Sequence, residues 1–379
     1  MTTFITGTTG YVGSYVATHH LRESDEKLLL LVRAKSKEAG ARRLWKSLQL
    51  HMAFDEFEAF LNDRVEIFLG DLTRPGLGLD DDEQDKLIKS MDSVVHIAAS
   101  LNRKSAKSCF NVNLRGTLHL LTLARAARDH HGLRRFSDVS TVAVSGKRSA
   151  ELVAEDDMID WDRSDFDPYA RTKKFCETMI EELLPDTSTL VFRPSIVLGD
   201  ARFPETTQFD MVRAFVFLAR LPVLPFRKHW RADIVNADYV GKAISRIHRL
   251  EAPKHRTYNL SSGAASQDFR SIVDSLVKAG LRRPLFVPWL EGPFNWLVNS
   301  LASSPRSLGI APFASLMKVF LPYLVYDTVF DNSHVVEELE EAPTPFSEYA
   351  FELFRFALDG NFEYPYRAWP GEAGEREDA

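Results

Sequence analysis

Residues 3–21, TFITGTTGYVGSYVATHHL, contain a short apolar run, a loop with three glycines and an amphipathic helical stretch. In the turn Gly7-Thr8-Thr9-Gly10-Tyr11-Val12-Gly13 each glycine has a mechanical role, since the three provide a tight turn, room for a pyrophosphate against bare backbone, and close packing of helix on strand. The phosphates would lie at the helix N-terminus, where unpaired N–H groups and the helix dipole favour anions. The stretch predicts a dinucleotide-binding loop; the alternative is a turn that is merely rich in glycine.

The second predicted strand ends in LVRAKS, residues 31–36, which contains Arg33. Dinucleotide-binding folds commonly carry an acidic residue about 20 positions past the glycines, where it binds the ribose 2′-hydroxyl. An arginine at this place suits a 2′-phosphate instead, and Arg43 and Lys35 could assist it. The pattern predicts NADPH rather than NADH, and the alternative is a surface arginine at the end of a strand.

The first half of the chain alternates short apolar runs with helical patterns, which is typical of βαβ units. The predicted strands are Thr3–Thr6, Leu28–Val32, Val65–Leu69, Ser93–Ile97, Phe136–Ser140 and Thr189–Phe192. The predicted helical stretches include Gly13–Arg22, Lys37–Leu50, Val112–His130 and Tyr169–Leu184. Near-continuous apolar runs such as LLLLV, residues 28–32, suit a parallel sheet covered on both faces. The prediction is an α/β fold with a doubly wound parallel sheet, a Rossmann fold.

The pattern changes from about Asp200. We expect an NADP-binding domain over residues 1–200. Residues 201–230 and 263–370, rich in Phe, Trp, Leu and Pro, are expected to form a smaller, mostly helical C-terminal substrate-binding region. RADIVNADYVGKAISRIHRL, residues 231–250, and TYNLSSG, residues 257–263, indicate that residues 231–262 return to the first domain. The charged tail, residues 371–379, is expected to be disordered.

The composition is that of an ordinary globular protein, with 45% hydrophobic and 26% charged residues in a chain of 379. A net charge of −6 without a basic block argues against nucleic acid as a partner. Cys109 and Cys176 are too few for a disulfide framework, and no metal-ligand spacing accompanies them. The sequence opens with MTTFITG rather than a secretory leader, so a cytoplasmic, reducing location is expected. The longest apolar run, Ile310–Tyr326, contains Lys318 and two prolines and is too short for a spanning helix.

DPYARTKKFCE, residues 167–177, places Tyr169 and Lys173 one helical turn apart. Taken alone, the pair is a short motif with a high chance of coincidence, and it could be a solvated pair on a helix surface. Other motifs precede it in order: the glycine loop, GDL at 70–72, VVHIAAS at 94–100, NLRGT at 113–117 and VSTVAVSG at 139–146. The ordered set resembles the extended short-chain dehydrogenase/reductase superfamily over roughly residues 1–262.

The resemblance implies a catalytic set of Thr141, Tyr169 and Lys173. Tyrosine has an ordinary pKa of about 10, and the Lys173 cation would favour the phenolate while also bonding the nicotinamide ribose. The Thr141 hydroxyl would hold the substrate carbonyl, and Ser140 is the alternative for that role.

The same resemblance, together with Arg33 and Arg43, implies a cofactor-binding set. In the superfamily the matching positions flank the adenine or line the path of ribose and nicotinamide, and Asn113 would order the active-site helix through a bound water. His96, at a strand end, is expected to be structural rather than catalytic. The expected cofactor-binding residues are Thr6, Gly7, Thr9, Gly10, Tyr11, Val12, Gly13, Arg33, Arg43, Asp71, Leu72, Ala98, Ala99, Asn113, Tyr169, Lys173 and Pro194.

Further stretches resemble the thioester-reductase branch of this superfamily, which includes fatty acyl-CoA reductases and the reductase domains of carboxylic acid reductases. They are residues 28–48, residues 64–83, the order Ser140-Thr141, and RADIVNADYVGKAI, residues 231–244. The last of these departs from the branch at Asn236, where proline is usual. Nucleotide-sugar epimerases would more often show an acidic residue after the second strand.

The resemblance implies hydride transfer from NADPH to a thioester carbonyl held by Thr141 and Tyr169. The hemithioacetal then collapses to an aldehyde and a free thiol, either coenzyme A or an acyl carrier protein, and a second reduction to the alcohol stays open. Two alternatives stand beside it. One is an NADP-dependent oxidoreductase of 3-oxo lipids or steroid-like ketones and alcohols with the same catalytic set. The other is a non-catalytic NADP-sensing protein, which would not need that set.

Aromatic, proline-broken segments such as Leu285–Leu301 would suit a tunnel for an acyl chain, since each buried CH₂ contributes roughly 0.8 kcal/mol. The same segments could equally be ordinary core, or they could contact a membrane surface. The sequence leaves these three interpretations and the oligomeric state open.

Overall fold

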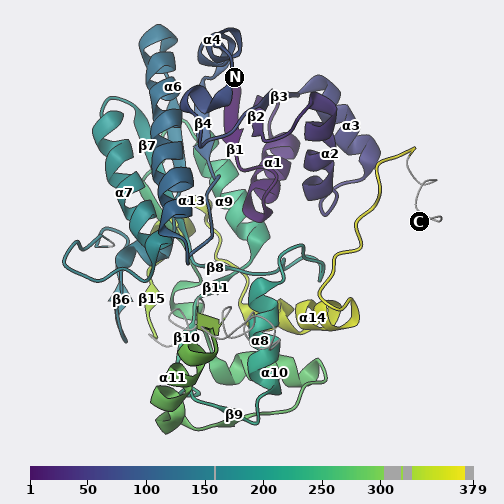
Figure 1. The fold of residues 1–379 in the computed structure, drawn as a ribbon, viewed down its shortest axis with the longest axis vertical. Coiled ribbons are helices and arrows are strands. Elements are labelled where there is room, and N and C mark those ends of the chain that lie inside the picture. Colours follow the sequence, from purple (N-terminus) through teal and green to yellow (C-terminus); the bar gives the residue numbers. More distant parts are fainter. Residues whose placement is uncertain (158, 303–316, 319–326, 372–379) are drawn as a thin grey trace.

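The computed structural model of the protein describes residues 1–157, 159–302, 317–318 and 327–371. At its centre is a seven-stranded sheet in which every neighbouring pair of strands is parallel (Figure 1). The strands are β1 Thr2–Thr6, β2 Lys27–Val32, β3 Val65–Leu69, β4 Ser93–His96, β5 Arg135–Val139, β7 Ser188–Pro194 and β12 Thr257–Leu260. Their order is β12-β7-β5-β4-β1-β2-β3, so the chain winds outward from β1 in both directions.

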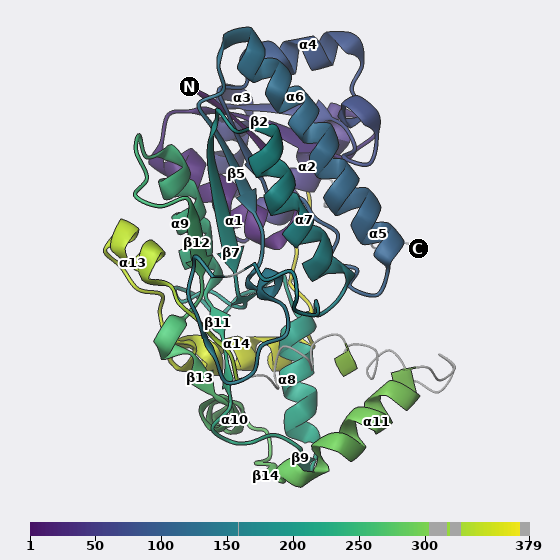
Figure 2. The ribbon, with the colours of Figure 1, turned by 90° about the vertical axis from the view of Figure 1, so that its left-hand side faces the viewer.

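Helices cover both faces of this sheet (Figures 1 and 2). One face carries α1 Tyr11–Glu23, α2 Lys37–Leu48 and α9 Ala237–Arg249, with α3 Phe54–Asp63 beside α2. The other face carries α4 Asp81–Ser90, α6 Gly116–His131 and α7 Pro168–Leu183. The apolar run of β2 serves both: Leu28 and Leu30 pack into the first layer, and Leu29 and Leu31 into the second. The predicted doubly wound sheet is therefore confirmed.

Three helices begin earlier than the sequence predicts, and α1, expected from Gly13, begins at Tyr11. The stretch expected from Val112 begins earlier, with α5 Ala106–Cys109 and a π-helical turn over Phe110–Arg115 that lead into α6. Helix α7 begins at Pro168, where the missing N–H costs no hydrogen bond. The Asp167 side chain before it accepts a hydrogen bond from the Ala170 N–H and caps the helix.

A smaller, helix-rich part lies below the sheet in Figure 1. Its core is apolar and includes Phe215, Phe226, Phe269 and Phe354. This part agrees with the predicted helical C-terminal region. Its helices are α8 Asp210–Arg220, α10 Phe269–Lys278, α11 Glu291–Ala302 and α14 Phe346–Asp359, and its strands are β9 Val223–Leu224, β10 Arg231–Ala232, β13 Gln267–Asp268 and β14 Leu285–Phe286.

The chain passes between the two parts more than once. Strand β8 Ile196–Val197 follows β7 and pairs with β11 Ile234–Val235, after which α9 packs on the main sheet and β12 joins it as a strand. Strand β6 Leu152–Val153 pairs with β15 Val329–Phe330, and α13 Ser333–Leu339 then packs near β12.

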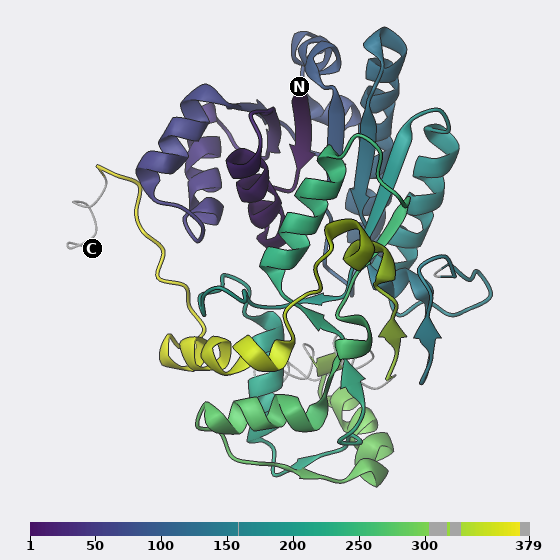
Figure 3. The same ribbon diagram turned by 180° about the vertical axis from the view of Figure 1, so that it is seen from behind.

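The last described residues run back to the sheet part (Figures 1 and 3). There the Trp369 ring lies 5.0 Å from the Phe54 ring, and the Arg367 side chain donates to the Met52 carbonyl at 3.0 Å. Of the expected disordered tail, residues 372–379 lie outside the described residues, as does the apolar run 310–326 apart from residues 317–318. No helix in the described ranges has the length and apolar character that a membrane crossing requires.

We expect Gly241→Ala to destabilise the fold, because α9 and α1 pack without space for a side chain at this point. A Cβ at Gly241 would lie 2.4 Å from the Tyr15 Cβ. Overpacking of this kind costs about 1–3 kcal/mol, which urea unfolding can measure. The matched control is Gly292→Ala in α11, where a Cβ would have no atom within 4 Å. Equal stability of the two variants would contradict the close packing of α1 on α9.

Candidate active site

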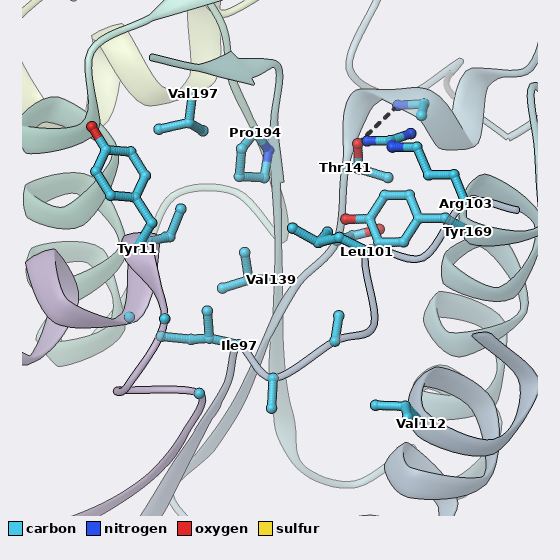
Figure 4. Close-up of a pocket in the computed structure, with 18 of the residues that line it drawn as sticks. Tyr11, Ile97, Leu101, Arg103, Val112, Val139, Thr141, Tyr169, Pro194 and Val197 are labelled. Carbon is cyan, nitrogen blue, oxygen red and sulfur yellow. Dashed lines mark hydrogen bonds between the residues drawn. The ribbon is translucent and has the colours of Figure 1, made fainter. Parts of the chain in front are cut away.

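A cavity of about 850 Å³ opens at the carboxyl ends of the sheet strands and extends to residues of the helix-rich part (Figure 4). This is the edge at which doubly wound sheets bind ligands. Most residues that the sequence predicts for the site line this cavity, whereas Thr6, Asn113 and Lys173 are not among its lining residues. The predicted residues in the lining are Gly7, Thr9, Gly10, Tyr11, Val12, Gly13, Arg33, Arg43, Asp71, Leu72, Ala98, Ala99, Thr141, Tyr169 and Pro194.

The loop between β1 and α1 depends on the absence of side chains. Gly7 has φ +86°, and a Cβ there would lie 2.7 Å from the Ala98 backbone nitrogen. A Cβ at Gly13 would lie 2.1 Å from the Gly7 carbonyl oxygen. Gly10 is the N-cap of α1 and offers no side chain to the first-turn N–H groups. The bare loop and helix start therefore fit the pyrophosphate of a dinucleotide.

Two arginines lie where the far end of a dinucleotide would bind. Arg33 and Arg43 are exposed and line the cavity, and the Arg43 guanidinium donates to the Arg33 carbonyl at 2.7 Å. Lys35 is exposed and is not in the lining. Burial disfavours the charged Asp71 carboxylate, but bonds from Thr73 and the nearby Arg33 cation lower the pKa of Asp71 below its ordinary value. This edge of the cavity therefore carries both cations and one carboxylate.

Thr6 and His96 support the floor of the site. The Thr6 hydroxyl bonds His96 Nδ1 at 2.7 Å and accepts from the Ala98 N–H at 3.3 Å. His96 Nε2 bonds the Thr117 hydroxyl at 2.9 Å, so both ring nitrogens are engaged. Thr6 fixes the backbone beside the glycine loop.

Asn113 joins two elements that bear site residues. Its side-chain oxygen accepts from the Ser100 N–H at 2.7 Å, and its amide donates to the Thr172 hydroxyl on α7 at 3.1 Å. The residue is buried. Asn113 thus ties the segment after β4 directly to the helix that carries Tyr169.

Thr141 and Tyr169 lie on the same side of the cavity, and Tyr11 lies opposite them (Figure 4). Thr141 follows β5 and accepts a hydrogen bond from the Ala143 N–H at 3.2 Å. The rival hydroxyl of Ser140 donates to the buried Glu177 carboxylate, which is paired with the Arg193 guanidinium at 2.7 Å. The engagement of Ser140 in that network favours Thr141 as the hydroxyl available to a substrate.

Arg103 is a cavity-lining cation that the sequence did not single out. Its guanidinium lies 4.6 Å from the centre of the Tyr169 ring and pairs with the Asp167 carboxylate at 3.0 Å. An arginine that follows the Ala98–Ala99 pair in a loop carries no distinctive local pattern. Its proximity to the tyrosine arises only when the loop folds over α7.

The Tyr169 hydroxyl is subject to opposing effects. Burial raises the pKa of Tyr169, the Lys173 and Arg103 cations lower it, and Asp138 raises it. The net pKa lies above the ordinary value, so the phenol is protonated at neutral pH. The Lys173 cation does favour the phenolate, but burial raises the pKa of Tyr169 by more than the cation lowers it. A protonated phenol is the form that can donate a proton.

Lys173 is buried to 1% exposure, and its ammonium lies 3.3 Å from the Asp138 carboxylate of β5. Asp138 is a partner of Lys173 that the sequence did not identify, and the bond from Lys173 to the ribose stays a prediction. The sequence carries a partial signal, because Asp138 is an acidic residue inside the predicted strand Phe136–Ser140. The burial of β5 along its whole length comes from the structure.

Comparison with known proteins identifies the family. The model of the male sterility protein family matches residues 5–244. A carboxylic acid reductase of Mycobacterium marinum is 27% identical over 345 residues, which are 82% of this chain and 29% of the relative. A linear gramicidin synthase of Brevibacillus parabrevis is 25% identical over 298 residues, which are 76% of this chain and 6% of the relative. The chain thus spans less than a third of either curated relative.

Among solved structures, the terminal R domain of the myxalamid PKS-NRPS pathway has a TM-score of 0.78 and 22% identity, with 95% of this chain and 91% of that one covered. Fold, cavity and family together define an NAD(P)-dependent oxidoreductase of the extended short-chain dehydrogenase/reductase superfamily. The chain belongs to the male sterility protein family, within the thioester-reductase branch of that superfamily.

Proposed function

We propose that the chain reduces acyl thioesters to aldehydes with NADPH as the hydride donor. The observation that carries the proposal is one continuous cavity lined by the glycine loop, by Thr141 with Tyr169, and by apolar residues near the helix-rich part. Support comes from the relatives, which include a carboxylic acid reductase and an L-2-aminoadipate reductase. Because the chain covers only part of their lengths, its own substrate is inferred from the site.

In the proposed reaction, Thr141 and Tyr169 bind the thioester carbonyl oxygen by donating hydrogen bonds. Bound NADPH supplies the hydride to the carbonyl carbon. Tyr169 transfers its proton to the carbonyl oxygen as charge develops there, which gives a hemithioacetal. The C–S bond then breaks, and an aldehyde and a free thiol leave. Because its pKa is raised, Tyr169 stays protonated until hydride transfer places negative charge on the carbonyl oxygen.

Other residues of the chain would hold these groups in place. Asn113 fixes α7 relative to the segment after β4 through Thr172. Lys173 would stabilise the phenolate that remains after proton transfer and would bond the nicotinamide ribose. Arg103, stacked on the Tyr169 ring, adds a second cation to the same phenolate.

For the acyl group we propose the part of the cavity that reaches the helix-rich region, with residues 201–230 and 263–370 as the substrate-binding region. Met211 and Phe330 supply apolar lining there, among polar residues such as Gln208 and Asp210. Within the described residues, Leu285–Leu301 contributes nothing to the lining, and Trp289 and Trp296 are 78% and 71% exposed. The exposed tryptophans of this segment therefore fit contact with a membrane surface better than they fit the lining of an acyl tunnel.

The first prediction from this function concerns the cofactor. Wild-type protein should bind NADPH more tightly than NADH, and Arg33→Asp should remove or reverse the preference. The 2′-phosphate would lose a cationic partner and meet a like charge. Fluorescence titration of both nucleotides measures the ratio, with Arg125→Asp on the exposed surface of α6 as the matched control. Equal wild-type affinity for the two nucleotides would exclude the NADPH assignment.

The second prediction concerns proton donation. Tyr169→Phe should lower kcat by roughly 10²–10⁴, the usual worth of a positioned acid, while the NADPH dissociation constant changes little. Steady-state turnover and fluorescence titration of the same preparation separate the two effects. A variant that keeps more than about a tenth of the wild-type rate would remove Tyr169 from the chemistry.

The third prediction concerns the substrate. Acyl-CoA or acyl carrier protein thioesters should be consumed with release of one thiol per NADPH oxidised in the first reduction. If the acyl chain lies against Met211 and Phe330, each added CH₂ should tighten binding by up to about fourfold, until the site is full. A chain-length series followed by NADPH absorbance and a thiol reagent measures both. Ketone reduction without thiol release from any thioester would favour the alternative ketone reductase. Thiol release without chain-length dependence would keep the reaction and discard this acyl site.

A further inference from the structure

Asp138 lies near the carboxyl end of β5 with its carboxylate completely buried. One oxygen, Oδ1, is 3.3 Å from the Lys173 ammonium, and the other, Oδ2, has no hydrogen-bond partner among the described residues. Burying a charged group costs several kcal/mol unless a partner compensates it. Lys173 and Asp138 are both buried beside Tyr169, so the charge of each depends on the other.

We propose that Asp138 is a positioning residue of the active site, which holds the Lys173 ammonium near Tyr169 and offsets part of its positive charge. The inference rests on the proposed reductase function, because it concerns the proton that Tyr169 donates. Asp138 does not line the cavity, so it would act on the reaction only through Lys173 and Tyr169.

The other ionisable groups around the pair leave Asp138 as the partner of Lys173. His96 on β4 is uncharged, because burial and the Lys173 cation lower its pKa well below the ordinary value. Burial raises the pKa of the Cys176 thiol to about 12, so it stays protonated. Two further carboxylates have arginine partners of their own: Glu177 pairs with Arg193, and Asp167 pairs with Arg103.

The charge of Asp138 has a definite direction of effect. The carboxylate raises the pKa of both Tyr169 and Lys173. If asparagine replaces it, a Lys173 that stays charged favours the Tyr169 phenolate more strongly. If Lys173 instead cannot stay charged without a partner, it loses its proton at a lower pH. Both routes move the alkaline decline of activity to lower pH, since the donor or its cation is lost earlier.

The test compares pH profiles of kcat, at saturating NADPH and acyl-CoA, for the wild type and Asp138→Asn. Glu155→Gln is the matched control, because Glu155 is also a buried carboxylate but accepts from the Asn259 and His334 N–H groups rather than from Lys173. A second readout needs no turnover. The phenolate absorbance of Tyr169, obtained by subtracting the titration of a matched Tyr169→Phe protein, is followed in each background.

We expect Asp138→Asn to move the alkaline decline of kcat to lower pH by about one unit, the low end of the effect of a nearby charge. The Tyr169 titration should move to lower pH if Lys173 stays charged, and to higher pH if Lys173 loses its proton, because the phenolate then loses a cation. Glu155→Gln should leave both at the wild-type position. In a Lys173→Met background, Asp138→Asn should no longer lower the pH at which Tyr169 titrates, because burial without the Lys173 cation raises the pKa of Asp138 further and leaves its carboxyl uncharged. Asp138→Ser provides the same comparison if the amide prevents folding.

A uniform loss of rate with both titrations unmoved would overturn the inference and leave Asp138 as a packing residue. A shift of equal size in Glu155→Gln would also overturn it. Failure of the wild type to consume any thioester would instead defeat the proposed function, and the Tyr169 titration would still decide the role of Asp138.

Discussion

The close approach of Gly13 to the Gly7 carbonyl is the constraint on which the rest of the structure depends. A Cβ at Gly13 would lie 2.1 Å from that oxygen, so only glycine lets the loop after β1 close and α1 start at the sheet edge. The same closure brings Gly7 against the backbone of Ala98 at the end of β4. Because these glycines have no side chains, β1, the neighbouring β4 and α1 can approach one another closely at the mouth of the cavity.

From that loop the site extends to groups whose chemistry is set by burial. Tyr169 lies at the first turn of α7, whose start is fixed by Pro168 and the Asp167 cap. Burial and Asp138 raise its pKa, whereas Lys173 and Arg103 lower it. Burial dominates, because removing a phenolate from water costs more than two partly neutralised cations return. Tyr169 is therefore protonated, and it can donate this proton to a carbonyl oxygen as negative charge develops there.

The sequence sufficed for features that depend on local pattern. The apolar strands and the glycine loop follow from spacing along the chain, and the motif around Tyr169 follows from the resemblance. Together they predicted the sheet and part of the cavity lining. It was insufficient where two side chains from distant elements meet. The pairing of Lys173 with Asp138 joins α7 to β5, and Arg103 reaches the Tyr169 ring from the loop after β4. Neither contact has a sequence period, because each depends on how elements cross in three dimensions.

The most direct test of the central claim is a single turnover with NADPH deuterated at the transferred position and a saturated acyl-CoA. Thioester reduction predicts an aldehyde with one deuterium on its carbonyl carbon and one equivalent of free coenzyme A for each nucleotide oxidised. Mass spectrometry of the trapped aldehyde and a thiol assay measure the two quantities together. If no label enters the acyl carbon and no thiol appears, while a ketone substrate takes up the label, the account of this protein as a thioester reductase is contradicted.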